Sequence, residues 1–117
     1  MKKQIYFYRT VNQKCPVEVF LNSLPSKVRQ KITWTLKLLV DLDRVPASYF
    51  SKMSGTDHFW ECRVKLGSNI YRIFAFMDGN QIVLTHGIIK KTQKTPKREI
   101  QKAKKYREDY LRRLKKR

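Results

Sequence analysis

Apolar residues recur with the spacing of an α-helix twice in the first part of the chain. The first series follows Pro16, which suits a first helical turn because its missing N–H has no partner there, and comprises Val17, Phe20, Leu21 and Leu24. Pro25 interrupts the pattern. A longer series then comprises Val28, Ile32, Leu36, Leu39 and Leu42. The spacing predicts two helices, and their short connection predicts a helical hairpin.

The pattern then changes to the two-residue period of β-strands. Residues 43–58 carry Pro46, Gly55 and several serines, and are predicted to form a loop. Between residues 60 and 66 apolar and charged positions alternate, which places one side of a strand in the core and leaves the other side with Glu61, Arg63 and Lys65. The aromatic segment 5–9 predicts an earlier strand at the beginning of the chain.

Two further strands and a final helix complete the expected fold. Residues 70–77 form a nearly continuous apolar strand pattern, interrupted only by Arg72. Asp78-Gly79 is typical of a hairpin turn, and residues 81–89 are predicted to form the next strand. Thr95-Pro96 is typical of a helix start. The helix that follows has a predicted apolar face of Ile100, Ala103, Tyr106, Tyr110, Leu111 and Leu114. The predicted order is β-α-α-β-β-β-α: an α+β fold with a small, mostly antiparallel sheet, the helical hairpin on one face and a basic C-terminal helix.

The net charge of the chain says more about its function than its length does. The chain has 117 residues, which predicts one domain over 1–117, and 41% of them are hydrophobic, enough for a core. Its 27 Lys and Arg against nine Asp and Glu give a formal net charge of +18. A chain so charged repels itself unless an anionic partner compensates, and nucleic acid is the expected partner because phosphate contacts release counterions. A membrane surface or an acidic protein is the alternative.

Cysteine and histidine usage points to a reduced, cytoplasmic protein without a metal site. Cys15 and Cys62 form no CxxC pair, and His58 and His86 do not complete a zinc-ligand spacing. No segment has the apolar run of a signal peptide or the length of a membrane span. We therefore expect no metal, no cofactor and no membrane partner.

Basic residues gather on the predicted strands in a way that suggests a site. Arg63 and Lys65 share one side of a strand, about 7 Å apart, Arg72 stands in the next strand, and Lys90 and Lys91 end the last. On one sheet face they would form a cradle for a phosphodiester backbone. That cradle suits RNA cleavage by the substrate's own 2′-hydroxyl, which needs charge stabilisation, a base and an acid, and no metal.

Each of these residues also has a plainer structural interpretation. Arg63 is equally consistent with a surface ion pair, to Glu61 or to a carboxylate of a neighbouring strand, and Glu61 is equally consistent with a base or a salt-bridge partner. His86, flanked by Leu84 and Ile88, is more typical of a buried sheet histidine than of a catalyst. Arg72 is harder to explain by packing, because an arginine is rarely needed within an apolar strand, and a function is favoured for it.

Three segments together resemble a known family: residues 60–64 (WECRV), 69–74 (NIYRIF) and 86–96 (HGIIKKTQKTP). Their order is similar to the phage-derived, HigB-like branch of the RelE/ParE toxin superfamily, and the predicted helices agree with its layout. The resemblance implies a toxin of a type II toxin–antitoxin pair, inhibited by a HigA-like helix-turn-helix antitoxin. It further implies that the protein cuts messenger RNA in the ribosomal A site.

The resemblance also implies roles for individual residues. Arg63 and Lys65 match the family's basic pair before the hairpin, and Arg72 matches an arginine that holds the scissile phosphate. Lys91 matches a residue near the leaving oxygen, which gives the expected catalytic set of Arg63, Lys65, Arg72 and Lys91. Further RNA contacts are expected from Lys90, Lys94, Glu61 and His86.

Two departures from the family concern the general base. RelE carries a tyrosine just beyond the basic pair, where this chain has Thr95-Pro96-Lys97, and compact HigB enzymes use a C-terminal histidine, where this chain ends in Lys115-Lys116-Arg117. Lys65 and Glu61 are the candidates that remain.

The main rival is a ParE-like protein that binds DNA gyrase and cuts nothing, because the fold is shared. The dense basic set favours the nuclease, since a gyrase binder has no need of it. A non-catalytic RNA-binding module agrees with the charge alone. An antitoxin is expected to lay an acidic segment across the basic face or to displace a helix, and the free toxin is expected to be monomeric.

Overall fold

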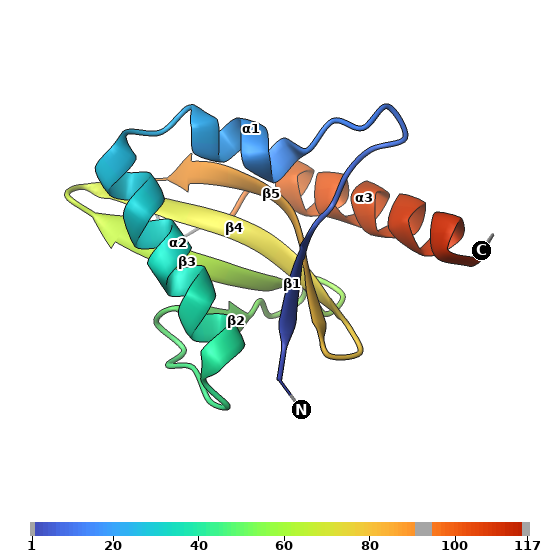
Figure 1. Cartoon of the computed structure of the whole chain (residues 1–117). Coiled ribbons are helices and arrows are strands. Elements are labelled where there is room, and N and C mark those ends of the chain that lie inside the picture. Colours follow the sequence, from blue (N-terminus) through green and yellow to red (C-terminus); the bar gives the residue numbers. More distant parts are fainter. Residues whose placement is uncertain (1, 91–94, 116–117) are drawn as a thin grey trace.

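The computed structural model describes residues 2–90 and 95–115 (Figure 1). This part of the chain forms three helices and one mixed five-stranded sheet, which confirms the α+β class. Its elements in chain order are β1 (Gln4–Phe7), α1 (Pro16–Asn22), α2 (Ser26–Asp41), β2 (Phe50–Lys52), β3 (Trp60–Leu66), β4 (Asn69–Asp78), β5 (Gln81–Lys90) and α3 (Lys97–Lys115).

The sheet has the strand order β1-β5-β4-β3-β2. Neighbours pair antiparallel from β2 to β5, whereas β1 runs parallel to β5, with Gln4 opposite Gln81. The predicted element order was wrong by one strand. Residues 50–52, expected within a loop, form the short edge strand β2, because their backbone pairs with residues 60–62 of β3.

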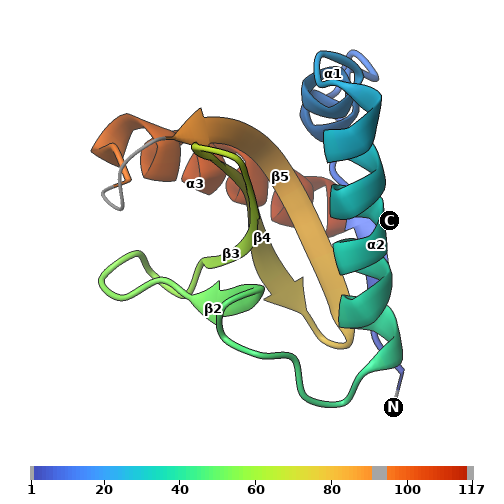
Figure 2. The ribbon, with the colours of Figure 1, turned by 90° about the vertical axis from the view of Figure 1, so that its left-hand side faces the viewer.

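Helices α1 and α2 cover one face of the sheet (Figure 2). The predicted stripe of α2 is buried there, except for Leu42, which lies past the end of the helix and is exposed. Gly87 of β5 allows α1 to lie close, because a Cβ at this position would come within 2.4 Å of the Phe20 ring. The core between the layers contains Val17, Leu24, Val28, Ile32, Leu36, Leu39, Phe50, Cys62, Val64, Tyr71, Ile73, Ala75, Ile82 and Leu84.

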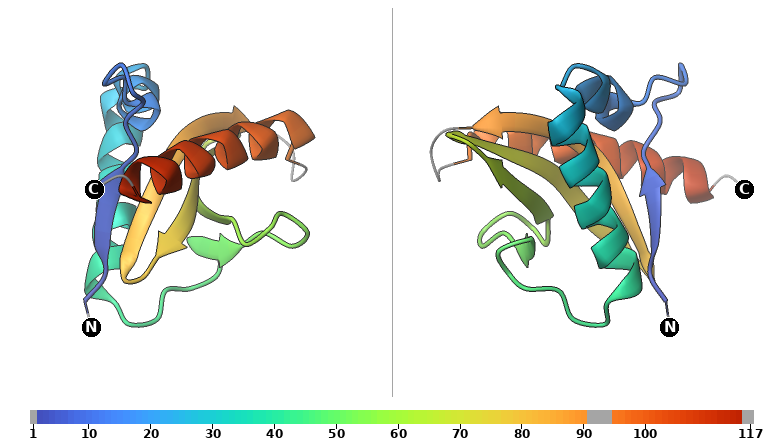
Figure 3. Two further views of the ribbon diagram at one scale, coloured as in Figure 1. Left: turned by 90° about the vertical axis from the view of Figure 1, so that its right-hand side faces the viewer. Right: turned by 60° about the vertical axis from the view of Figure 1, so that its left-hand side comes forward.

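Helix α3 crosses the opposite face of the sheet (Figures 2 and 3). Ala103 is fully buried there, and a second cluster joins it to Tyr8, Phe59, Phe76 and Val83, with Ile100, Tyr106 and Tyr110 packed around it. The predicted apolar face of this helix was wrong at its end. Leu111 and Leu114 are exposed, because the last turns of α3 run past the sheet.

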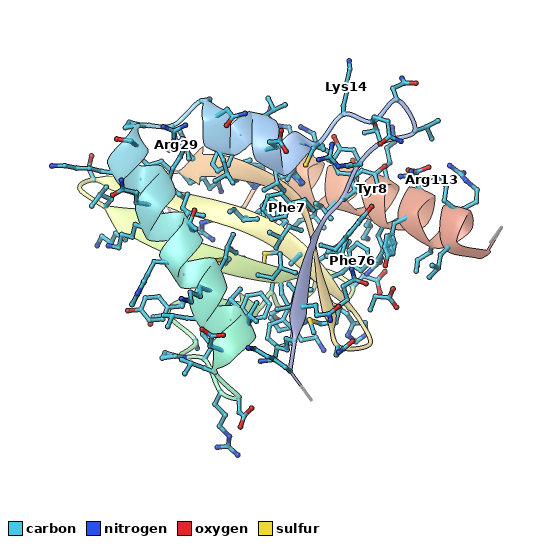
Figure 4. The ribbon with its side chains drawn as sticks, in the orientation of Figure 1. Phe7, Tyr8, Lys14, Arg29, Phe76 and Arg113 are labelled. Carbon is cyan, nitrogen blue, oxygen red and sulfur yellow. The ribbon has the colours of Figure 1, made fainter. Side chains whose placement is uncertain are left out.

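Polar contacts fix the C-terminal half of α3 to the sheet. The Tyr8 hydroxyl donates to Asp109 at 2.5 Å, and the Tyr110 hydroxyl donates to Asp78 at 2.7 Å. The Arg113 guanidinium lies 5.5 Å from the centre of the Tyr8 ring, and both side chains are labelled in Figure 4. Burial, together with the Asp109 carboxylate, raises the pKa of Tyr8 to about 12.

None of the helices among the described residues combines the length and the apolar character needed to cross a membrane.

Candidate functional site

The predicted basic residues of β3, β4 and β5 lie on one face of the sheet, the face that α3 partly covers. Arg63 of β3 is the direct cross-strand partner of Arg72 in β4, which in turn faces Ile88 of β5. Two residues further along these strands, Lys65 of β3 and Lys90 of β5 pair with Ile70 of β4 from its two sides. We call these four basic side chains, Arg63, Lys65, Arg72 and Lys90, the cationic row. Because directly paired residues point to the same side of a sheet, its members share one surface.

A β-bulge brings His86 onto the same face. Phe74 pairs with His86 and Ala75 pairs with Leu84, so Thr85 is the extra residue in β5. Strict alternation would place Leu84 and His86 on one side of the strand. The bulge reverses that, so that Leu84 packs in the core under α1 and α2 while His86 lies beneath α3.

Glu61 lies between the two arginines of the cationic row. Its Oε2 is 2.8 Å from Nη1 of Arg72, and its Oε1 is 3.7 Å from Nε of Arg63. The Glu61 and Arg72 side chains are 7% and 3% exposed, whereas Arg63 is 29% exposed. The carboxylate thus offsets the repulsion between two guanidinium groups that face each other across the strands. Arg63 presents the more accessible guanidinium of the two.

His86 belongs to a buried hydrogen-bond network. Burial lowers the pKa of His86 to about 4, although the nearby Glu99 carboxylate acts in the opposite direction. The ring is therefore neutral at pH 7, and Nε2–H donates to Glu99 of α3 at 3.1 Å, while Thr85 Oγ1 lies 3.1 Å from Nδ1. In this arrangement α3 covers the imidazole, and the RNA contact predicted for His86 is not open to a ligand.

The two lysines of the cationic row lie toward the end of the sheet. Lys65 is exposed and Lys90 is half-buried. Lys31 of α2 donates to the backbone carbonyl of Lys65 at 2.7 Å, which fixes the end of β3. Exposure along the row thus increases from Arg72 to Lys65. Lys91 and Lys94, the other two predicted basic residues, lie outside the described residues.

A cavity of about 520 Å³ opens beside Arg72. One wall is the connection between β2 and β3, residues 53–56, and Glu61 and Arg72 form its inner end. The other wall is the beginning of α3, where Thr95 Oγ1 lies 3.5 Å from Nη1 of Arg72. On that side the cavity is lined by Thr95, Lys97, Ile100, Gln101 and Lys104.

The two walls of this cavity are tied together. Arg107 of α3 donates to the Asp57 carboxylate at 2.6 Å and to the Asp57 carbonyl at 2.7 Å, and its guanidinium lies 4.2 Å above the Phe59 ring. Asp57 and His58 both adopt left-handed backbone angles, φ 64° and 68°, which non-glycine residues rarely do. The connection is therefore an ordered, locally strained segment.

Sequence reasoning did not identify the cavity. Residues 53–56 were expected only as loop, and Thr95 only as a helix cap. Ile100 was assigned only to the apolar face of α3. No pattern in the sequence signals that these segments meet, because their contact depends on the crossing position of α3 and on β2.

The family comparison covers the segments that form this face of the sheet. The family described as Phage derived protein Gp49-like (DUF891) matches residues 19–108, which includes α2, all of β2 to β5 and the part of α3 that lines the cavity. The chain belongs to this family, which is part of the RelE/HigB-like toxin superfamily, and it is thus a toxin-like protein. Among curated proteins, none matches the chain.

Proposed function

We propose that this protein is the toxin of a type II toxin–antitoxin pair, of the HigB-like branch, and that it cleaves messenger RNA on the ribosome in the cytoplasm. The observation that carries the proposal is the cationic row. Four basic side chains on one sheet face are more than folding requires, and they supply the positive charge that a cleaved phosphodiester needs.

The proposed reaction is attack of the RNA 2′-hydroxyl on the adjacent phosphate, which leaves a cyclic phosphate. Arg63 binds the scissile phosphate. Arg72 adds positive charge next to Arg63, and Glu61, which contacts both arginines, holds the two guanidinium groups in place. Lys65 sits near the attacking hydroxyl. Lys91, outside the described residues, is expected near the leaving oxygen. Loss of one such contact costs roughly 3 kcal/mol of transition-state stabilisation, a hundredfold or more in rate.

Lys65 is the better candidate for the general base than Glu61. Both oxygens of Glu61 face guanidinium groups, and the side chain is nearly buried, so a substrate hydroxyl has little access to it. Lys65 is exposed on the same face and reaches solvent. Its base function is tested by Lys65→Ala, for which the proposal expects a larger decrease in the cleavage rate than in RNA affinity.

A cognate antitoxin of the HigA-like, helix-turn-helix kind is proposed as the protein partner. The free toxin is proposed to be monomeric, because its net charge of +18 opposes self-association. An acidic antitoxin segment placed across the cationic row would neutralise it. The rival function is gyrase binding without cleavage, which would leave messenger RNA uncut.

The test is translation-coupled messenger cleavage. Purified protein is added to a translating extract, 5′ ends are mapped by primer extension, and a ribosome-free reaction is run in parallel. Arg63→Ala is the first variant, because Arg63 is partly exposed and its removal does not leave a buried charge without its main partner. Arg29→Ala, on the exposed side of α2, removes the same charge away from the site and is the matched control.

The proposal expects cuts within translated frames that require ribosomes, slowed about a hundredfold by Arg63→Ala and unchanged by Arg29→Ala. Intact messenger with normal translation would overturn it. DNA damage signalling in expressing cells, with messenger uncut, would favour the gyrase-binding alternative.

A further inference from the structure

We propose that the cavity between residues 53–56 and α3 binds one unstacked RNA base, next to the phosphate held by the cationic row. The inference rests on the proposed function and deepens it, because it adds a base-reading subsite to a phosphate-binding face. It also predicts which bases fit, and it is testable apart from cleavage.

The position of the cavity suits a base attached to the bound phosphate. Arg72 belongs both to the cationic row and to the inner end of the cavity, and its cross-strand partner Arg63 stands beside it, more exposed. A phosphate bound at Arg63 therefore lies one cross-strand pair away from a residue that lines the cavity. At about 520 Å³ the cavity is large enough for a nucleobase together with part of its ribose.

The cavity has the mixed lining that a base requires. Met53 and Ile100 supply apolar surface from opposite walls, and a polarisable thioether packs well against a flat ring. Ser54, Thr56 and Thr95 supply hydroxyls near the edges, although Thr56 already donates to the Met53 carbonyl at 2.7 Å. A base enclosed in this way has its faces against carbon and sulfur and its edge toward polar groups.

Charge in the lining favours bases that carry carbonyl oxygens. Arg72, Lys97 and Lys104 only donate hydrogen bonds, and the acceptor Glu61 already faces two guanidinium groups. Guanine, through O6 and N7, and uracil, through its two carbonyls, offer acceptors to such a site. Adenine and cytosine present an amino group where guanine and uracil carry a carbonyl oxygen, and an amino group gains nothing from the three cationic donors of the lining. We therefore infer a preference for guanine and uracil.

The cavity is already formed without a ligand. The Arg107 contacts with Asp57 and Phe59 hold the β2–β3 connection against α3. The left-handed backbone at Asp57 and His58 is maintained by these contacts. Preorganisation of this kind reduces the ordering cost of binding, so even a single nucleotide is expected to bind measurably.

The experiment fills the cavity from its helical wall. Gln101 is exposed and lines the cavity, so Gln101→Trp blocks the space with little effect on the core. Gln30→Trp introduces the same side chain at an exposed position of α2, on the other face of the sheet, and is the matched control. Each protein is titrated with GMP, UMP, AMP and CMP by NMR, and each is also assayed in the translating extract.

The inference expects GMP and UMP to shift the amide signals of residues 54–56 and 100–101, with at least tenfold weaker binding in Gln101→Trp and none of this loss in Gln30→Trp. It also expects the parent to cut beside G or U, and this preference to weaken in Gln101→Trp. Equal binding of all four nucleotides by parent and Gln101→Trp would overturn the base subsite, even if the parent cleaves messenger. Absence of cleavage by the parent, with nucleotide binding as expected, would overturn the proposed function alone.

Discussion

Arg63 and Arg72 face each other directly across β3 and β4, and the carboxylate of Glu61 lies between their guanidinium groups. Two like charges at paired positions destabilise a sheet unless a third group compensates. The arrangement holds one arginine buried and in place, and leaves the other at the surface. Glu61, Arg63 and Arg72, which come from two of the three segments that resemble the family, thus form one group of interacting charges. Only Arg63 is accessible to solvent to any extent.

The first prediction concerns the stability of this unit. Glu61→Gln removes the charge that Arg72 faces, and breaking a buried ion pair on one side costs roughly 3–5 kcal/mol. The free energy of unfolding, measured by urea denaturation, is expected to fall by about that amount. Glu108→Gln changes an exposed glutamate of α3 and is expected to change it by less than about 0.5 kcal/mol. Equal stability of the two variants would contradict a structural role for Glu61.

The second prediction separates folding from function at Arg72. Arg72→Ala alone leaves the Glu61 carboxylate buried beside a cavity, so lost activity in that variant is ambiguous. Replacing both partners, as Glu61→Leu with Arg72→Met, exchanges the ion pair for apolar volume, which is often neutral for stability. The double variant is expected to recover most of the parental unfolding free energy and to remain at least a hundredfold slower in cleavage. Recovery of cleavage along with stability would show that Arg72 only supports the fold.

The third prediction is a loss of stability in mild acid. Unfolded His86 has an ordinary pKa of 6.5, and the folded value is about 4, so below pH 6.5 the unfolded chain binds a proton that the folded protein does not. Stability is expected to fall between pH 6.5 and pH 4, by on the order of 3 kcal/mol. His86→Gln, which retains a donor toward Glu99, should flatten this part of the profile. His58→Asn, at the exposed histidine, should not, and an unchanged slope in His86→Gln would contradict the assignment.

The fourth prediction concerns Tyr8. Its pKa of about 12 means that it ionises later than an ordinary tyrosine, whose pKa is near 10. An ultraviolet titration should therefore contain a late component, and Tyr8→Phe is expected to remove the amplitude of one tyrosine from it. The effect on stability is opposite to that of a carboxyl group whose pKa is lowered on folding, because folded Tyr8 keeps its proton at a pH where the unfolded chain loses it. Stability is therefore lost as the pH rises from about 10 toward 12. A Tyr8→Phe protein that retains the full late amplitude of the parent would refute the assignment.

The fifth prediction tests the close approach of α1 to β5. Gly87→Ala places a methyl group against the Phe20 ring, at a distance that requires one of them to move. The expected cost is about 1–3 kcal/mol of unfolding free energy. Phe20→Leu, which removes the ring, should make Gly87→Ala considerably less harmful in the double variant. Strict additivity of the two substitutions would show that they do not meet.

Local pattern was enough to predict much of the fold. The helical stripes before and after Pro25, the alternation from Trp60 and the turn at Asp78-Gly79 are short-range signals, and each corresponds to an observed element. The strand β2 was missed because three residues become a strand only through a partner. The parallel pairing of β1 was missed for the same reason, since its partner lies far along the chain.

The candidate site was predictable in its charges but not in its shape. Alternation placed Arg63 and Lys65 on one side of β3, and both lie on the face that bears Arg72. The interpretation of His86 as a buried sheet histidine is confirmed, but the bulge at Thr85, which decides the face of the sheet on which His86 lies, was not predicted. The burial of Arg72 was not foreseen either. It depends on Thr95 and α3, which reach β4 only in the folded chain.

The pairing of β1 with β5 has a consequence for biosynthesis. Strand β1 is synthesised long before β5 and has no partner until residues 81–84 have emerged, and helix α1, which packs on β5, also waits for that strand. Folding of such non-local contacts is slow and cannot be completed early during synthesis. Lys90 and the helical wall of the cavity come later still. The cationic row and the helical wall of the cavity therefore come together only after the chain from β1 to the beginning of α3 has been synthesised.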